Sequence, residues 1–331
     1  MDSLTQIVLG ASVGEAVLGK KLGNKAIWYG AVAGTIPDLD VIARNFTDTV
    51  TALELHRGFT HSIVFAVVFG LFFGWLCSLW EKRATWKQWS WFWFFCLVTH
   101  PLLDAHTTWG TQLFWPFDLR LAYKNIFVID PLYTLPFLVL LIMAMRLKRD
   151  NPKRRKWNRL GLIVSSTYLV VTLMLKGITY HKFTSALEEQ GIVYSEIETK
   201  PTPFNSILWT ANIDTEDAYL IAYYSLFDSQ PISFSKHPKN HHTLGPLAYS
   251  DKVKRLITIS QGWYVVSQKN GSTYFNDLRF GQLSVDPNNK DYVFSFLLEP
   301  QGDDIVVSEN EKRPEDAGKM LGGLWERIWG N

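Results

Sequence analysis

A run of nineteen residues without a charged side chain, residues 62–80, is the feature that most restricts the fold of this chain. The run is rich in Phe, Val, Leu and Trp, and a helix that crosses the hydrocarbon core of a bilayer needs about 20 such residues. Averaged over all 331 residues the mean hydropathy is near zero, because the apolar residues are concentrated in runs of this kind. The run therefore predicts a membrane-spanning helix.

Five further segments complete a set of six predicted spans. Three of them are slightly shorter than a full span until flanking Tyr, Trp and Asn residues are allowed into the interface; they are residues 90–103, 131–145 and 160–175. The other two, 4–19 and 26–37, are rich in Gly and Ala, which favours close helix packing. Glu15 interrupts the first of these, so a pair of short buried helices remains the alternative for both.

Basic residues predict the orientation of the spans. The segment 146–159 contains eight Lys or Arg and one Asp, and short loops of this kind stay on the cytoplasmic side. If successive spans cross the membrane in alternating directions, the connections 20–25 and 81–90 lie on the same side as this loop. Both connections are basic. Six passes with both chain ends outside follow from this pattern. A binding patch for anionic lipid or nucleic acid is the less economical interpretation.

Residues 179–331 have a different composition from residues 1–178. They hold twenty Asp and Glu against fourteen Lys and Arg, whereas residues 1–178 hold eleven against nineteen. Short β-branched and aromatic runs separated by turn-forming residues predict strands; these runs are 206–213, 218–227, 263–267, 273–285 and 292–298. We therefore predict an α-helical polytopic membrane domain, 1–178, followed by an extracytoplasmic, mostly antiparallel β domain, 179–331.

The N-terminal residues bear on whether the first helix is cleaved, and the two cysteines bear on disulfides and metal binding. Asp2 and the lack of a basic n-region or a small-residue cleavage site argue against a cleaved signal peptide, so we expect the first helix to remain. Cys77 and Cys96 both fall within apolar spans, which offers neither a disulfide scaffold nor a thiolate zinc site.

Histidine and aspartate residues gather in three motifs of the N-terminal half, and Asp2 with Gln6 is a candidate fourth cluster. The motifs are Pro37-Asp38-Leu39-Asp40, His56-Arg57-Gly58-Phe59-Thr60-His61-Ser62 and Thr99-His100-Pro101-Leu102-Leu103-Asp104-Ala105-His106. Imidazole and carboxylate together are a ligand set for zinc, manganese or iron. The predicted topology, which uses none of these residues, puts all three motifs at the outer face. Ionisable groups close to membrane spans are functional candidates by default.

Each residue also has a structural interpretation. Asp38 and Asp40 suit an Asx turn at a helix end, and Asp104 suits a cap on the next segment. His106 is a third ligand, a general acid or a solvated side chain. Arg57 either binds a phosphate or carboxylate oxygen or bridges to Asp38 or Asp40. The histidines of the second domain, His181, His237, His241 and His242, are interpreted as solvated surface.

These motifs, together with Met1-Asp2-Ser3-Leu4-Thr5, resemble those of bacterial membrane-bound metal-dependent hydrolases of the YdjM type, over about the first 150 residues. The resemblance implies metal-dependent hydrolase chemistry, and the His and Asp pattern is more distantly similar to that of zinc-dependent phospholipase C and related nucleases. Many members carry His where this chain has Gln6, which leaves the number of metal ions open. The domain after residue 179 lies outside the resemblance.

The first functional hypothesis is a metal-dependent phosphoester hydrolase of the inner or plasma membrane, acting at its outer face on lipid or lipid-linked substrates. Its metal ligands are Asp38, Asp40, His61, His100 and Asp104, holding one or two divalent ions, with zinc ahead of manganese and iron. His56 or His106 serves as general acid or base, and Arg57 contacts the substrate. The rival hypothesis is a non-catalytic membrane protein whose cluster senses or conducts metal ions or protons. No signature of a nucleic-acid-binding fold accompanies the basic loop, so we expect no nucleic acid partner.

Overall fold

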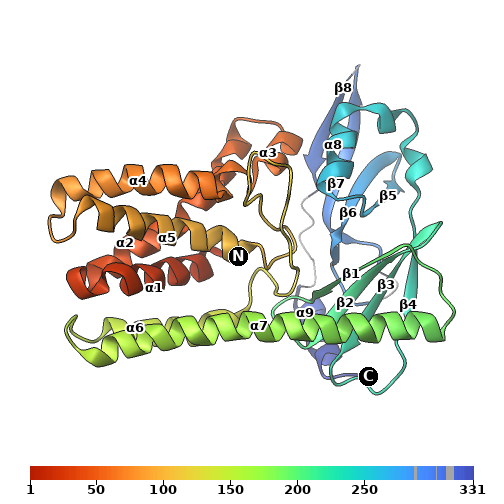
Figure 1. Cartoon of the computed structure of the whole chain (residues 1–331). Helices are drawn as coiled ribbons and strands as arrows, with labels where there is room; N and C mark the ends of the chain where they lie inside the picture. The colour runs from red at the N-terminus through yellow and green to blue at the C-terminus, as the bar shows by residue number, and fades with distance from the viewer. Residues whose placement is uncertain (287–288, 303, 311–316) are drawn as a thin grey trace. The chain divides into compact units, whose positions relative to one another are not determined.

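The computed structural model describes the whole chain except residues 287–288, 303 and 311–316. It divides into two compact units. The first comprises Met1–Ala43, Leu55–Leu175 and Pro203–Asn205, and the second comprises Arg44–Glu54, Lys176–Thr202 and Ser206–Asn331. The predicted order, a helical N-terminal region followed by a domain of antiparallel sheets, is confirmed (Figure 1).

The first unit is built from helices. They are α1 (Ser3–Leu22), α2 (Asn24–Thr35), α4 (Ile63–Trp80), α5 (Trp86–Asp104), α6 (Pro131–Met145) and the first part of α7 (Pro152–Glu189). Two short 3-10 helices, η1 (Pro37–Asn45) and η2 (Phe59–His61), connect them. Large apolar side chains such as Trp89, Phe92 and Phe137 are fully buried between these helices, so the predicted apolar runs form a packed core as well as an apolar surface.

Two of the helices meet the length and composition of a membrane span, within the part of the chain that the structure describes. These are α4 and α7, and α6 is a shorter apolar helix. The remaining predicted passes coincide with α1, α2 and α5. Six passes therefore stay a prediction, whereas the helical nature of each predicted run is confirmed.

Glycine allows α1 and α2 to pack with their backbones in contact. A Cβ atom added to Gly10 of α1 would lie 2.3 Å from the carbonyl oxygen of Gly30 in α2, closer than any side-chain carbon tolerates. Small residues permit such close packing of membrane helices. The contact fixes α2 so that its last turn, and η1 directly after it, lie beside α1 and α5.

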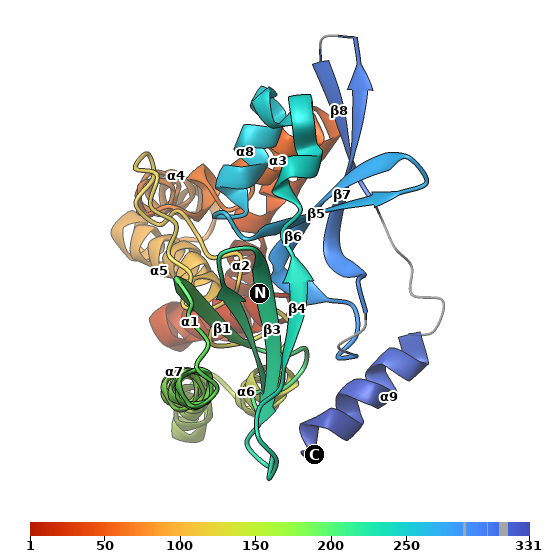
Figure 2. The ribbon, with the colours of Figure 1, turned by 90° about the vertical axis from the view of Figure 1, so that its right-hand side faces the viewer.

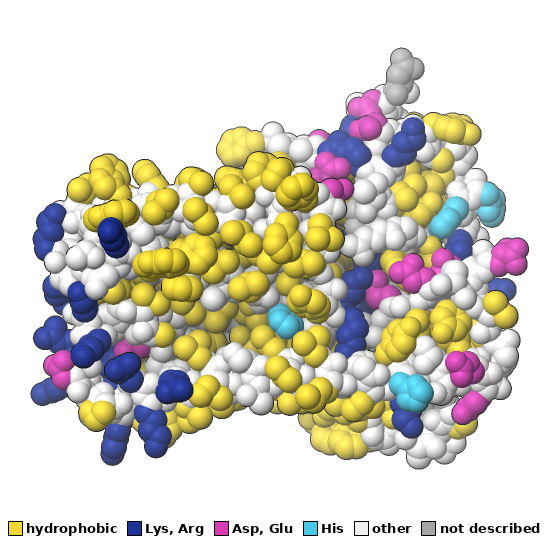
Figure 3. All heavy atoms as spheres, viewed as in Figure 1, with side chains coloured by type: hydrophobic (Ala, Val, Ile, Leu, Met, Phe, Trp, Pro, Cys, Tyr) yellow, Lys and Arg dark blue, Asp and Glu magenta, His cyan; other side chains and the backbone are white. Residues whose placement is uncertain are grey.

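Basic residues gather at one end of the helical unit, and apolar side chains cover its middle (Figure 3). The connections at this end contact one another: Lys25 pairs with Glu81 at 3.3 Å, and Lys21 donates to Gln88 at 2.8 Å. Asn24 likewise donates to the carbonyl oxygen of Met145. The segments with the His and Asp motifs are at the opposite ends of the same helices, as the predicted alternation requires.

The basic segment 146–159 is only partly a loop, because α7 begins at Pro152 and continues for 38 residues. Its rise of 1.5 Å per residue gives a length of about 57 Å, which exceeds the roughly 30 Å hydrocarbon thickness of a bilayer. Its first part, Pro152–Leu175, belongs to the first unit, and its second part, Lys176–Glu189, belongs to the second.

The second unit contains two four-stranded antiparallel sheets with sequential strand order. The first consists of β1 (Glu196–Pro201), β2 (Leu208–Asp214), β3 (Ala218–Ser225) and β4 (Phe234–Pro238). The second consists of β5 (Tyr264–Lys269), β6 (Ser272–Gln282), β7 (Tyr292–Gln301) and β8 (Asp304–Glu309). Asn212 of β2 donates to the carbonyl oxygen of Leu278 in β6, so the two sheets are in contact.

Short helices complete the second unit. They are α3 (Thr49–Leu55), η3 (His241–Tyr249), α8 (Asp251–Ile259) and α9 (Ala317–Ile328). Arg255 of α8 pairs with Glu54 of α3 at 2.6 Å, which ties a segment from the N-terminal half into this unit. The last turn of α9, seen in Figure 2, is joined to β3 and the loop after it, because Ser225 donates to the carbonyl oxygen of Ile328 and Arg327 pairs with Asp228.

Candidate metal centre

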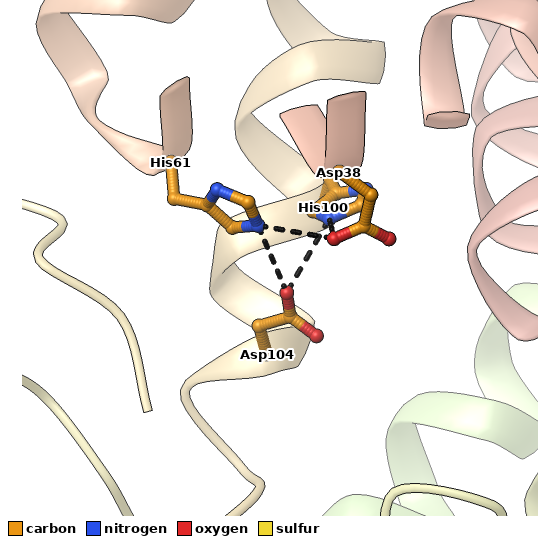
Figure 4. Close-up of side chains that lie close together, drawn as sticks. All are labelled: Asp38, His61, His100 and Asp104. Carbon is orange, nitrogen blue, oxygen red and sulfur yellow. Dashed lines mark ion pairs between the residues drawn. The ribbon is translucent and has the colours of Figure 1, made fainter. Parts of the chain in front are cut away.

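Three segments bring four ligand-type side chains together. Asp38 lies in η1, just after α2, and His61 ends η2, just before α4. His100 and Asp104 stand four residues apart on the last turns of α5, so they share one face of that helix. Pro101 does not break α5. All four side chains point to a common centre (Figure 4).

The four donor atoms are spaced as ligands of one ion would be. The Nε2 atoms of His61 and His100 each lie 3.3 Å from Oδ2 of Asp104. They also lie 3.4 and 3.3 Å from Oδ1 of Asp38. A tetrahedral edge is about 1.6 times the metal–ligand distance, so zinc bonds of about 2.0 to 2.1 Å give edges of roughly 3.3 Å. Four of the six separations match that edge, and all four donor atoms lie within 4.8 Å of one another, so the cluster could hold a metal ion.

Three of these donor atoms are buried without a hydrogen-bond partner among the described residues. They are Nε2 of His61, Nε2 of His100 and Oδ2 of Asp104. A buried polar atom left unpaired costs free energy, so such atoms are rare in folded proteins. Three such atoms face one point, in a cluster that could hold a metal ion.

Hydrogen bonds to the other imidazole nitrogens set the tautomers. Nδ1 of His100 donates to the carbonyl oxygen of Gly34 at 2.7 Å. Nδ1 of His61 lies 3.0 Å from Oγ1 of Thr60, and that hydroxyl donates to Asp40 at 3.2 Å. Each Nδ1 is thereby the protonated nitrogen, which leaves the Nε2 lone pairs for the ion, as metal-binding histidines usually require.

Asp40, which the sequence also predicts as a ligand, lies beside the cluster of four candidate ligands rather than in it. Its carboxylate accepts hydrogen bonds from the Arg57 amide at 2.8 Å and faces Nδ1 of His56 at 3.0 Å. It is also 3.5 Å from Nδ1 of His61. Burial raises the pKa of Asp40, but the adjacent His56 and His61 and the Arg57 amide lower it to below its usual value. The carboxylate thus orients the histidines while staying ionised.

Asp38 is the one candidate ligand with a partly exposed side chain, at 23% against 0 or 1% for the other three. Burial raises its pKa, yet the neighbouring imidazoles of His100 and His61 hold the pKa well below the ordinary value. Asp38 is therefore an anionic donor on the accessible side of the centre.

Arg57 and Gln6 surround Asp104. Nε of Arg57 lies 3.2 Å from Oδ2 of Asp104, without the alignment of a hydrogen bond, and the guanidinium donates to Thr107. Nε2 of Gln6 donates to Oδ1 of Asp104 at 3.0 Å, and the amino group of Met1 contacts the same oxygen. Gln6 therefore contacts the ligand Asp104, and its own Oε1 is buried without a partner in the described part of the chain.

His106 has a different environment from the four ligands. Its Nδ1 lies 2.8 Å from Oδ1 of Asn125, whose amide donates to Thr172 in α7. Burial lowers the pKa of His106. Asp104 does not cap the next helix, since Asp130 caps α6. Thr60, which connects His61 to Asp40, was not anticipated, because nothing in the sequence distinguishes it from other threonines.

One expectation about the second unit is wrong. The sequence predicts a solvated His237, but this side chain is buried in β4, with Nδ1 3.2 Å from the hydroxyl of Tyr292. His241 is stacked on the ring of Tyr264 at 3.9 Å between centroids. Neither belongs to the cluster of four.

The fold and the site together define a helical membrane protein with a His and Asp cluster that could hold a metal ion, and with a C-terminal domain of antiparallel sheets. The model of the family described as YdjM inner membrane protein matches residues 1–179, and the chain belongs to this family. The resemblance seen in the sequence motifs is thereby confirmed.

Two relatives extend the comparison. Inner membrane protein YbcI of Escherichia coli (strain K12) is 34% identical over 103 residues, which cover 30% of this chain and 59% of that protein. Uncharacterized protein YfhP of Bacillus subtilis (strain 168) is 23% identical over 276 residues, 72% of this chain and 84% of that protein. No solved structure matches the chain. Neither relative's name states an activity.

Proposed function

We propose that this protein is a metal-dependent hydrolase, a phosphoesterase that acts on lipid or lipid-linked substrates at the outer face of the inner membrane. The observation that carries the proposal is the convergence of three unpaired buried donor atoms, from His61, His100 and Asp104, with the carboxylate of Asp38. Two imidazoles and two carboxylates suit zinc best, and manganese or iron also accept this set.

A bound divalent ion would lower the pKa of its water to about 7 and polarise the phosphoryl oxygen. His61, His100 and Asp104 would hold it from the buried side. Asp38 is the donor closest to solvent, so the open coordination position that a catalytic metal needs would lie beside Asp38. The four residues of the cluster would supply the donors for one ion. A second ion would need donors from other residues.

His56 is the better placed of the two candidate acid–base residues. Its Nδ1 faces the ionised Asp40 at 3.0 Å, and no described residue pairs with its Nε2. The side chain is 29% exposed, and its ring centroid lies 6.3 Å from that of His61. A carboxylate on one nitrogen orients the ring, which suits a general base or acid. His106 would instead position Asn125 and α7.

The apolar residues beside the centre support a lipid-like substrate. Three apolar side chains next to the two aspartates in η1 are about half exposed; they belong to Leu39, Val41 and Ile42. The segment after α5 exposes Phe114, Phe117 and Leu119. It is attached to the ligand-bearing segment, because the Ile63 amide donates to Leu113 and the Gln112 amide donates to Arg57. A water-soluble substrate would not need such apolar surroundings.

The outer face follows from the positive-inside bias. Because basic connections are at one end of the helical unit and the cluster is at the other, cytoplasmic basic loops would put the cluster outside. Arg57 is occupied by Asp104 and Thr107, so a role in substrate binding would require it to exchange partners. We assign it to holding Asp104.

A sensing or conducting role is the competing proposal. Conduction would need polar groups through the depth of the unit, and Glu15 is the acidic group in the interior of α1. Its carboxylate is held by Arg154 in a closed ion pair with both side chains 2% exposed. This arrangement favours the enzyme.

The test is elemental analysis of detergent-purified protein, followed by assays on phospholipids and on a chromogenic phosphodiester. The comparison is between wild type and the double variant His100→Ala, Asp104→Ala, with His181→Ala as a control that removes an exposed histidine of α7. We expect stoichiometric metal and metal-dependent hydrolysis in wild type and in the control, and neither in the double variant. Metal binding without hydrolysis of any phosphoester would favour sensing or conduction, and a well-folded metal-free wild type would overturn both.

A further inference from the structure

The C-terminal helix α9 presents apolar side chains on two sides. Ile328 is buried, and the hydroxyl of Ser225 donates to its carbonyl oxygen. Leu321 and Trp325 stand four residues apart on one side of α9, and Trp329 follows directly after its end; they are 52, 61 and 55% exposed. The last turn of the helix is therefore attached to β3, while an apolar stripe is left uncovered.

Phe227, in the loop after β3, extends this stripe. Its ring is stacked on that of Trp329 with 5.7 Å between centroids, and Trp329 in turn contacts Trp325 at 5.4 Å. Phe227 is itself 52% exposed. We name Leu321, Trp325, Trp329 and Phe227 the aromatic stripe.

The aromatic stripe is held in a fixed position by polar contacts. Arg327 donates two hydrogen bonds of 2.6 Å to the carboxylate of Asp228, the residue next to Phe227. Ser229 donates to the carbonyl oxygen of Asn331, beyond the end of α9. A bidentate pair of this kind fixes orientation as well as distance. The stripe is thus a preformed surface, and ordering it on binding would cost little entropy.

Chain continuity connects this surface to the membrane. Helix α7 continues without interruption from its apolar part into the second unit, where Phe183 contacts Tyr224 at the end of β3. Tyr224 is three residues before Phe227. The part of α7 in the second unit therefore contacts the strand that leads into Phe227 of the aromatic stripe.

We propose that the aromatic stripe of α9 docks on the lipid bilayer that holds the helical unit, with its Trp rings at the level of the headgroups. Tryptophan is enriched at that level because its ring has an apolar body and a polar N–H, and amphipathic helices lie there in the plane of the interface. Four side chains that are about half exposed offer on the order of 400 Å². This is half of the roughly 800 Å² per partner of a stable protein interface, so a bilayer fits better than a second copy.

The experiment places a fluorescent label on Leu321→Cys in the full-length chain, which keeps both Trp residues of the aromatic stripe. The matched control is a label on Tyr249→Cys, an exposed aromatic residue of the same unit that is far from α9 in the sequence. The unsubstituted chain gives the background from the buried Cys77 and Cys96. All are reconstituted in vesicles of phosphatidylethanolamine with a minority of phosphatidylglycerol, with or without brominated acyl chains.

We expect brominated lipid to quench the label at position 321, and iodide in the aqueous phase to quench it several-fold less than the label at 249. Asp228→Asn, which weakens the attachment of α9, should reduce lipid quenching at 321. Equal iodide access at both positions would overturn the proposal. Protection from iodide without lipid quenching would overturn it as well, since a protein surface would then cover the stripe. None of these outcomes depends on metal binding or hydrolysis.

Discussion

Arg154 donates two hydrogen bonds to the carboxylate of Glu15, at 2.7 and 2.6 Å, and so joins α7 to α1 across 139 positions of the chain. Its remaining nitrogen donates to Asn24 and to the carbonyl oxygen of Leu147. The guanidinium thereby connects three helices at the basic end of the helical unit. A residue of the segment predicted as a cytoplasmic loop is thus a buried structural element.

Replacing one partner of this pair leaves the other charge buried. We expect Glu15→Leu to lower the free energy of unfolding by about 3 to 5 kcal/mol, and Glu15→Leu with Arg154→Leu to recover much of that loss. Thermal unfolding in detergent, followed by light scattering, measures both. The control is Lys25→Met, which removes the 63% exposed partner of Glu81 and should change the free energy by roughly 0 to 1 kcal/mol. A loss in Glu15→Leu as small as in Lys25→Met would contradict the structural role.

The second prediction concerns the hydroxyl between His61 and Asp40. Thr60→Val keeps the shape of the side chain but removes the group that fixes the tautomer of His61. Loss of such an outer contact typically lowers metal affinity about 10- to 100-fold. Metal titration of the stripped protein, with a chelator of known affinity as competitor, gives the value.

Thr99→Val is the matched control, since the hydroxyl of Thr99 bonds only to carbonyl oxygens of its own helix α5 among the described residues. Its metal affinity should equal that of wild type. If the two variants bind metal with the same affinity, the contacts from Asp40 through Thr60 to His61 do not affect the metal affinity of the site.

Much of the fold is predictable from the sequence because apolar runs and charge bias act over whole helices. The missed strands β1, β4 and β8 are all edge strands, and their short, charged sequences are what edge strands need to avoid pairing with other chains. The start of α7 was missed for a related reason: Lys and Arg are good helix formers, so a basic run marks the cytoplasmic side without marking a loop.

The composition of the site was predictable only in part. Topology alone brings η1, η2 and the end of α5 to one end of the unit. Two aspartates two residues apart on a short 3-10 helix cannot be ranked from sequence, because the turn geometry decides that Asp38 points to the centre and Asp40 to His56. The burial of His237 cannot be predicted from the sequence either, because β4 is not among the predicted strands.

The third prediction separates the two candidate acid–base residues. His56→Gln removes the group that faces Asp40 but none of the four donors, so the metal content should stay stoichiometric. Turnover should fall about 10²- to 10⁴-fold, the usual contribution of a general acid or base. The same assay on His106→Gln should show a smaller loss in turnover, accompanied by a lower unfolding temperature because the link through Asn125 to α7 is broken. Loss of metal from His56→Gln would mean that His56 belongs to the ligand set.

The last prediction is a pH dependence of the second unit. Burial lowers the pKa of His237, and the charge of Lys290 lowers it further. The unfolded chain, with an ordinary histidine pKa of about 6.5, then binds more protons than the folded chain as the pH falls below that value. The free energy of unfolding therefore decreases from about pH 7 towards about pH 5. His237→Gln should make the unfolding temperature of the full chain less dependent on pH over this interval, whereas His181→Gln, which alters an exposed side chain, should leave the dependence unchanged. Identical pH profiles for wild type and His237→Gln would show that the buried His237 does not set the acid sensitivity.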